Sequence, residues 1–180
     1  MRGVISIYQY TDKEIEQLLK QLVVVVDSRE QKCRHITDYF DQKNIKWCTQ
    51  KLDYGDYTAK LTIPGKHKDF YLQDVCTIER KRCLNELSSN LSHERLRMER
   101  EFMRVRGVLL LLIENAAYED ILLHHYDTGY KPQAFIGTLK SFESKYDIHT
   151  HFQKDAAYSG AFIYHTLFYA MRNVLKKGVV

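Results

Sequence analysis

A chain of 180 residues with 44% hydrophobic content is long enough for one sizeable core and too short for two, which predicts a single domain over 1–180. The 27 Lys and Arg against 23 Asp and Glu give a net charge of +4, which permits a nucleic-acid partner without requiring one. The apolar runs are too short to cross a bilayer, and the four cysteines form no CxxC pair. We therefore expect a soluble, cytoplasmic protein with reduced thiols and no membrane partner.

The first third of the chain predicts a leading helix, a buried strand, a second helix and then a hairpin. Thr11 is a candidate N-cap with Glu14 three residues on, which predicts a helix within the segment 1–21. Val23–Asp27 is a β-branched run without polar alternation, typical of a central strand covered on both faces. Further elements are expected as a helix in 35–44, strands in 45–52 and 56–63 joined by the turn 53–55, a hairpin tip in 64–69 and a strand in 69–79.

The rest of the chain alternates helices with strands. The expected elements are a charged helix from 84 to 105, a buried strand in 107–114, a short helix in 118–123, a helix in 132–146 opened by Pro132, a half-exposed strand in 147–153 and a terminal helix from 159 to 176. Strands separated by helices, with antiparallel strands early in the chain, predict a three-layer α/β/α sandwich around a central mixed β-sheet. We assign 22–152 to a catalytic core and 153–180 to a C-terminal helical segment.

Charged residues collect at the ends of the early strands, in the segments 27–30, 55–57 and 79–81. Side chains alternate along a strand, so Glu79 and Lys81 share one face and Arg80 lies on the other. A carboxylate and an ammonium are therefore expected to address one point in space.

This combination of residues suits hydrolysis of a phosphodiester. The reaction needs a divalent ion held by hard oxygen ligands and a group that stabilises charge near the attacking water. Asp56 and Glu79 supply carboxylate oxygens. Lys81 is suited to stabilising the developing hydroxide or to holding the phosphate. Arg80 is better suited to binding a phosphate or an acidic side chain.

Three ordered motifs carry a resemblance to a known family. "VVVVDSRE" resembles an opening strand that ends in D-x-R-E, "LDYGDY" resembles a G-D-Y segment, and "TIERKRCLNEL" resembles an E-R-K element with its following helix. Together they are similar to the XPF-type structure-selective nuclease domain of the restriction-endonuclease-like superfamily. The likeness spans about Val23 to Phe152 and is strongest with phage and bacterial members.

The resemblance implies a DNA endonuclease that uses Mg²⁺ or Mn²⁺ and prefers branched DNA. It implies Asp56 and Glu79 as metal ligands, with the main-chain carbonyl of Arg80 completing the set, and Lys81 as a catalytic residue. The remaining site residues that it implies are Asp27 and Glu30, which would line the site, and Arg29, which would support them or touch DNA.

One departure from the family pattern leaves an alternative open. The family usually carries an Asp where this chain has Asn85, and Glu86 is next to it. Either Glu86 substitutes in part, or the position is secondary. A non-catalytic DNA-binding or scaffolding relative of the same fold is the alternative function. A sequence-specific restriction enzyme would need a recognition region, for which no segment is spare.

Several of these residues also have structural interpretations. Asp27 and Glu30 are alternatively the N-cap and first-turn acid of the next helix. Arg95 shares the inward stripe of the charged helix, so we expect it to be buried against an active-site acid and near DNA. Tyr57 is suited to stacking on an unpaired base, with packing as the alternative. The terminal helix is apolar around most of its girth, which predicts a homodimer.

Overall fold

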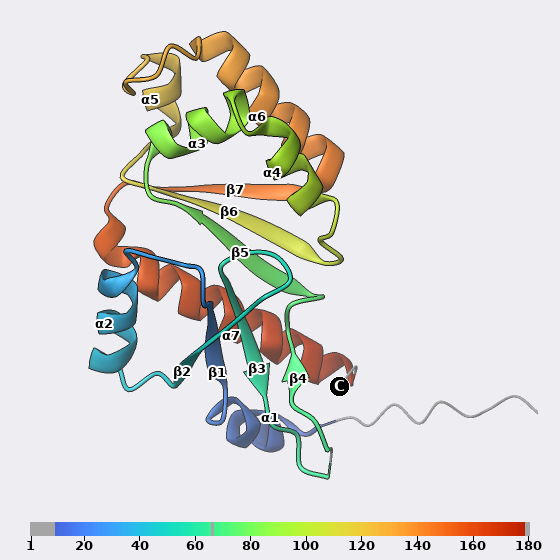
Figure 1. Ribbon diagram of the computed structural model, residues 1–180. Coiled ribbons are helices and arrows are strands. Elements are labelled where there is room, and N and C mark those ends of the chain that lie inside the picture. Colours follow the sequence, from blue (N-terminus) through green and yellow to red (C-terminus); the bar gives the residue numbers. More distant parts are fainter. Residues whose placement is uncertain (1–9, 66, 179–180) are drawn as a thin grey trace, which may run out of the picture.

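The computed structural model describes residues 10–65 and 67–178, and the predicted leading segment before Tyr10 lies outside them. Within these residues a seven-stranded mixed sheet separates two helical layers (Figure 1). The strand order is β2-β1-β3-β5-β6-β7, and β4 pairs with β3. The predicted three-layer α/β/α sandwich is therefore confirmed.

The strands β1 (Val23–Asp27), β2 (Trp47–Gln50) and β3 (Tyr57–Leu61) form one half of the sheet. β1 pairs in parallel with β2 through the crossover helix α2 (Arg34–Gln42) and antiparallel with β3. The successive strands β2 and β3 are thus separated by β1. β1 is buried as expected, but it is second from the sheet edge and not central.

The other half contains β5 (Cys76–Lys81), β6 (Val108–Glu114) and β7 (Ile148–Gln153), all parallel. The strand predicted over 69–79 is divided into β4 (Phe70–Tyr71) and β5. A turn separates them, because the amides of Val75 and Cys76 both donate to the carbonyl of Leu72. β3 and β4 form the predicted hairpin around 64–69.

The helices α1 (Asp12–Leu19), α2 and α7 (Ser159–Lys177) form one helical layer, with the short helix η1 (Ala156–Tyr158) before α7. The predicted capping box of Thr11 and Glu14 opens α1. α7 packs against both α1 and α2, and its apolar stripe meets β3 and β5. This layer backs the half of the sheet that carries Asp56.

The second layer consists of α3 (Leu84–Ser92), α4 (Arg95–Phe102), α5 (Tyr118–Leu122) and α6 (Pro132–Tyr146). The prediction of a single charged helix from 84 to 105 is wrong, because the helix is interrupted at His93 and Glu94. Ser92 donates its hydroxyl back to the carbonyl of Ser88, and such bonds compete with helix propagation. No helix in the described part of the chain is long and apolar enough to cross a membrane.

Candidate active site

Asp56 lies where β3 and β5 separate. These strands share one bridge, between Tyr57 and Ile78, and beyond it the main chain of Asp56 still pairs with both neighbouring strands. The amide of Asp56 donates to the carbonyl of Ile78 at 2.9 Å, and the amide of Asp27 donates to the carbonyl of Asp56 at 2.8 Å. The Asp56 carboxylate then accepts the Arg80 amide at 2.7 Å. The opening of the sheet thus directs this carboxylate to the end of β5.

Gly55 fixes the turn that precedes Asp56. Its φ of 71° lies in the left-handed region that favours glycine. A Cβ at this position would lie 2.1 Å from Cγ2 of Thr77. The turn is therefore built for close approach to β5, which positions Asp56.

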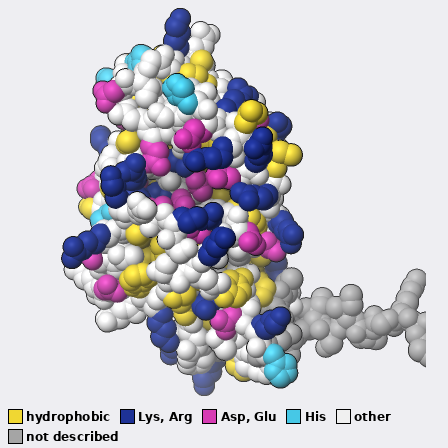
Figure 2. Space-filling view, viewed as in Figure 1, with side chains coloured by type: hydrophobic (Ala, Val, Ile, Leu, Met, Phe, Trp, Pro, Cys, Tyr) yellow, Lys and Arg dark blue, Asp and Glu magenta, His cyan; other side chains and the backbone are white. Residues whose placement is uncertain are grey.

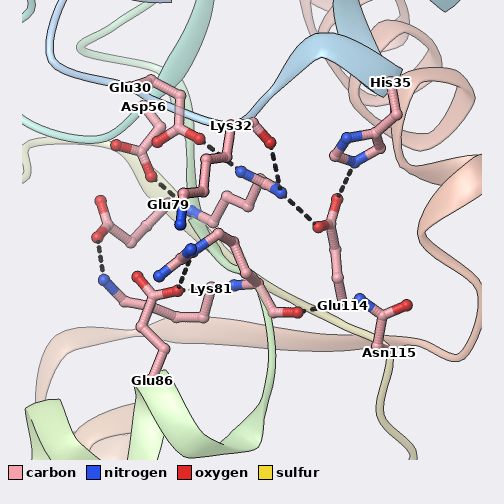
Figure 3. Close-up of polar contacts among 11 residues, drawn as sticks. Glu30, Lys32, His35, Asp56, Glu79, Lys81, Glu86, Glu114 and Asn115 are labelled. Carbon is pink, nitrogen blue, oxygen red and sulfur yellow. Dashed lines mark hydrogen bonds and ion pairs between the residues drawn. The ribbon is translucent and has the colours of Figure 1, made fainter.

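Glu79 and Lys81 occupy one face of β5, as the alternation of the strand predicts. The Lys81 ammonium lies 2.7 Å from Oε1 of Glu79, and both side chains are largely buried. Figure 3 shows the carboxylates of Asp56 and Glu79 on the same side of β5. Two carboxylates and an ammonium therefore converge at this strand end.

The electrostatics of this group favour an added cation. Burial raises the pKa of Asp56 well above its ordinary value, and the charges of Glu79 and Glu30 raise it further. Burial opposes the charge on Lys81, but the adjacent Glu79 raises the pKa of the ammonium overall. Lys81 is therefore protonated at neutral pH.

The Arg80 side chain points to the opposite face and enters a buried ion-pair network. Its guanidinium contacts Oε1 of Glu30 at 2.5 Å and Oε2 of Glu114 at 2.6 Å. Nε2 of His35 lies 2.9 Å from the other oxygen of Glu114. The expected pairing of Arg80 with an acidic side chain is confirmed, and the guanidinium is not free to bind a phosphate.

Sequence reasoning missed Glu114 and His35. Glu114 ends the buried strand β6, just as Asp27 ends β1 and Glu79 lies near the end of β5, and this repeated position was the available signal. Burial opposes ionisation of Glu114, but its bonds to Arg80 and His35 lower its pKa overall. Burial raises the pKa of Glu30.

Asp27 borders Asp56 through the main chain, but its own carboxylate is fully engaged elsewhere. It accepts bonds from the amide and guanidinium of Arg29 and from the amide of Leu52. Burial opposes its charge, and these bonds lower its pKa overall. The N-cap alternative is wrong, because α2 has Cys33 as its N-cap. Asp27 therefore anchors Arg29 and the loop after β2.

Two predicted substrate-binding residues lie elsewhere. Arg95 was expected to be buried against an active-site acid, but 49% of its side chain is exposed, it pairs with Glu99 at 3.9 Å and it lies over the ring of Phe142. The break between α3 and α4 turns it away from the core. Tyr57 is fully buried, so the packing alternative holds and base stacking by this ring was wrong.

Asn85 and Glu86 both bind neighbours. The Asn85 amide nitrogen donates to the Asp127 carboxylate at 2.7 Å, and the amide oxygen accepts the Asp127 main-chain amide at 2.8 Å. Glu86 accepts the main chain and guanidinium of Arg82. Among the described residues no three His, Cys, Asp or Glu side chains are placed to hold a metal ion together. Asp56 and Glu79 are the two carboxylates that converge beside Lys81 at the end of β5.

Figure 2 shows how charge is arranged on the face of the molecule seen in Figure 1. Acidic side chains gather across the middle of the view, and Lys and Arg side chains surround them. Such a pattern places cations where a polyanion would lie and carboxylates where an ion would be held.

The chain therefore has a mixed sheet with helices on both faces, and charged side chains converge at its strand ends. Residues 26–166 match the ERCC4 domain, and the chain belongs to this family of nuclease domains. Comparison with curated protein sequences gives no match.

Solved structures agree on the fold. XPF from Aeropyrum pernix superposes with a TM-score of 0.60 at 15% identity, over 84% of this chain and 66% of that chain. XPF from the same organism in complex with DNA gives a TM-score of 0.61 at 15% identity, with the same coverage. The predicted resemblance to the XPF nuclease domain is confirmed, and this chain spans 66% of the length of those chains.

Proposed function

We propose that this chain is a divalent-metal-dependent endonuclease that hydrolyses phosphodiester bonds in DNA. The observation that carries the proposal is the convergence of Asp56 and Glu79 beside the Lys81 ammonium. Family membership supports it, and the complex of an XPF with DNA shows that a protein of this fold binds that substrate.

The donor set fits Mg²⁺ or Mn²⁺, which prefer hard oxygen ligands. Burial raises the pKa of Asp56 most, and the charges of Glu79 and Glu30 raise it further, a repulsion that a bound cation would relieve. The Arg80 amide faces Asp56, and in an extended strand the carbonyl of the same residue points to the same edge. Asp56, Glu79 and the Arg80 carbonyl would therefore hold the ion.

A bound ion would neutralise charge on the scissile phosphate and activate a water. Lys81 then acts as a fixed cation, because its ammonium is protonated, and it stabilises an anionic oxygen of the phosphate or of the attacking hydroxide. Arg80 keeps the strand end in place through Glu30 and Glu114. Branched or junction DNA is the substrate that the family likeness favours, in recombination, replication or repair of a bacterial or phage genome.

Cleavage of fluorescent flap, fork, four-way-junction, nicked and linear DNA tests the proposal, with Mg²⁺, Mn²⁺ or EDTA. Asp56→Ala and Lys81→Ala should each lower the rate at least about 100-fold. Asp38→Ala and Lys43→Ala change an exposed residue of α2 and its exposed C-cap, and both variants should cut like the wild type. DNA binding without metal-dependent cleavage would instead favour the alternative function, a non-catalytic DNA-binding relative of the same fold. Asn85, in place of the usual Asp of the family, is the observation that supports this alternative.

A homodimer remains a prediction. Most of the apolar girth of α7 packs within the chain, and Phe162 stacks on His151 at 4.0 Å. The surface left for a second copy is smaller than expected, around Tyr164, Phe168 and the exposed Tyr169. Size-exclusion chromatography with light scattering should give twice the chain mass, and a monomer at high concentration would contradict this prediction.

A further inference from the structure

A basic pocket of about 280 Å³ is lined in part by Arg80 and Glu30 of the buried ion-pair network. Four of its lining residues are cationic and two are acidic, so the lining carries a positive balance. The lining residues are Arg29, Glu30, Gln31, Lys32, Arg80, Arg82 and Glu86. Arg29 is occupied by Asp27, and Arg80 by Glu30 and Glu114. Among the described residues Lys32 makes no hydrogen bond or ion pair through its ammonium, and Arg82 pairs with Glu86 through Nε alone. These two cations therefore keep most of their charged ends for a ligand.

Lys32 is held in a strained conformation at the edge of this pocket. Its φ of 56° is unfavourable for a residue with a side chain, and such outliers gather at functional sites. Its carbonyl accepts the Arg80 guanidinium at 3.5 Å. Within the described residues the ammonium makes no hydrogen bond or ion pair, and Figure 3 shows the side chain directed across β5. The strain therefore presents an unpaired cation.

Arg82 is positioned from two sides. The Asn115 amide donates to the Arg82 carbonyl at 3.1 Å, and Asn115 is itself in the left-handed region with φ 52°. Glu86 accepts the Arg82 main-chain amide at 3.1 Å and Nε at 2.9 Å. This pairing uses one edge of the guanidinium and leaves both terminal nitrogens for a ligand.

We propose that Lys32 and Arg82 form a clamp for one backbone phosphate of DNA, next to the phosphodiester that the Asp56 and Glu79 site cleaves. The inference rests on the proposed function and deepens it. A compact ammonium and a planar guanidinium bind phosphate oxygens by charge-assisted hydrogen bonds, and neither group is needed to hold the ion. The clamp sets the register of the strand and reads no base.

Salt-dependent DNA binding tests the clamp without cleavage. Fluorescence anisotropy of labelled flap and linear DNA in EDTA gives log K against log salt for the wild type and for the double variant Lys32→Ala, Arg82→Ala. Each phosphate neutralised contributes a slope of about 0.9, so the slope should fall by about one and affinity at about 0.1 M salt roughly tenfold. The control Lys13→Ala, Lys20→Ala removes the same charge from α1 and its C-cap and should keep the wild-type slope.

A glycine variant separates strain from charge. Lys32→Gly accepts the positive φ without penalty, so the protein should unfold at the same or a higher temperature while the salt slope still falls. In cleavage, the clamp variants should raise KM more than they lower kcat.

Two outcomes overturn the clamp in distinguishable ways. A wild type that binds and cuts DNA, with the double variant at the wild-type slope, removes the clamp and leaves the proposed function standing. A wild type that binds no DNA at low salt removes both.

Discussion

The buried Arg80 network makes a strong prediction for Glu114→Gln. The amide keeps the shape of the side chain but removes the charge that Arg80 and His35 contact. The Glu114 side chain is 1% exposed and the Arg80 side chain 3% exposed, so water cannot replace the lost carboxylate. Arg80 then keeps only Glu30 as an anionic partner.

Removing one partner of a buried pair costs roughly 3–5 kcal/mol, and the retained Glu30 places this change near the lower end, at about 3 kcal/mol. For a domain of this length each kcal/mol shifts Tm by about 2–4 °C, so a fall of roughly 6–12 °C is expected. Glu30→Gln should cost less, because burial raises the pKa of Glu30 and its charge is the more expensive one to keep.

Thermal and urea unfolding followed by circular dichroism measure this change. The control is Glu119→Gln, an exposed acid on α5. A Tm within about 2 °C of the wild type would refute the argument.

The pH dependence of the stability difference between the wild type and Glu114→Gln gives a second test. The folded pKa of Glu114 is lowered, so its stabilisation is present above the unfolded value and is lost as pH falls through the folded pKa. The gap between wild type and variant should therefore narrow below about pH 4.

Three further predictions concern single positions. Asp56→Asn should abolish cleavage yet stabilise the fold at neutral pH, because it removes a buried carboxyl group whose pKa is raised by burial and by the charge of Glu79. A less stable variant in urea unfolding would count against this. Asn85→Asp places two carboxylates together at Asp127, so it should destabilise by about 1 kcal/mol and give no faster cleavage, whereas a gain would show that the position faces the ion. Gly107→Ala would bring a Cβ within 2.5 Å of the Val75 carbonyl, so Tm should drop by several degrees, and an unchanged Tm would contradict that close contact.

The sequence predicted those parts of the site that depend on strand alternation. Glu79 and Lys81 share a face because successive side chains of β5 point to opposite sides, and Arg80 faces the other way for the same reason. The buried runs at Val23–Asp27 and 107–114 predicted strands because covered strands lack polar alternation.

The rest depended on contacts between distant residues. Glu114 is the last residue of a buried strand, but its pairing with Arg80 arises from the parallel register of β5 and β6. The prediction that Arg95 is buried failed because the inward stripe of α3 does not continue into α4. The Ser92 hydroxyl donates to the main-chain carbonyl of Ser88, and this hydrogen bond helps to end α3. Separation of β2 from β3 follows from the α2 crossover, which local pattern does not encode.

The central claim is that Asp56 and Glu79 hold one divalent ion. Titration of the purified protein with Mn²⁺, followed by electron paramagnetic resonance, tests this claim without DNA or turnover. We expect one ion for each chain, with affinity reduced at least about tenfold in both Asp56→Asn and Glu79→Gln and unchanged in Glu119→Gln. Equal Mn²⁺ binding by the wild type and both site variants would contradict the account.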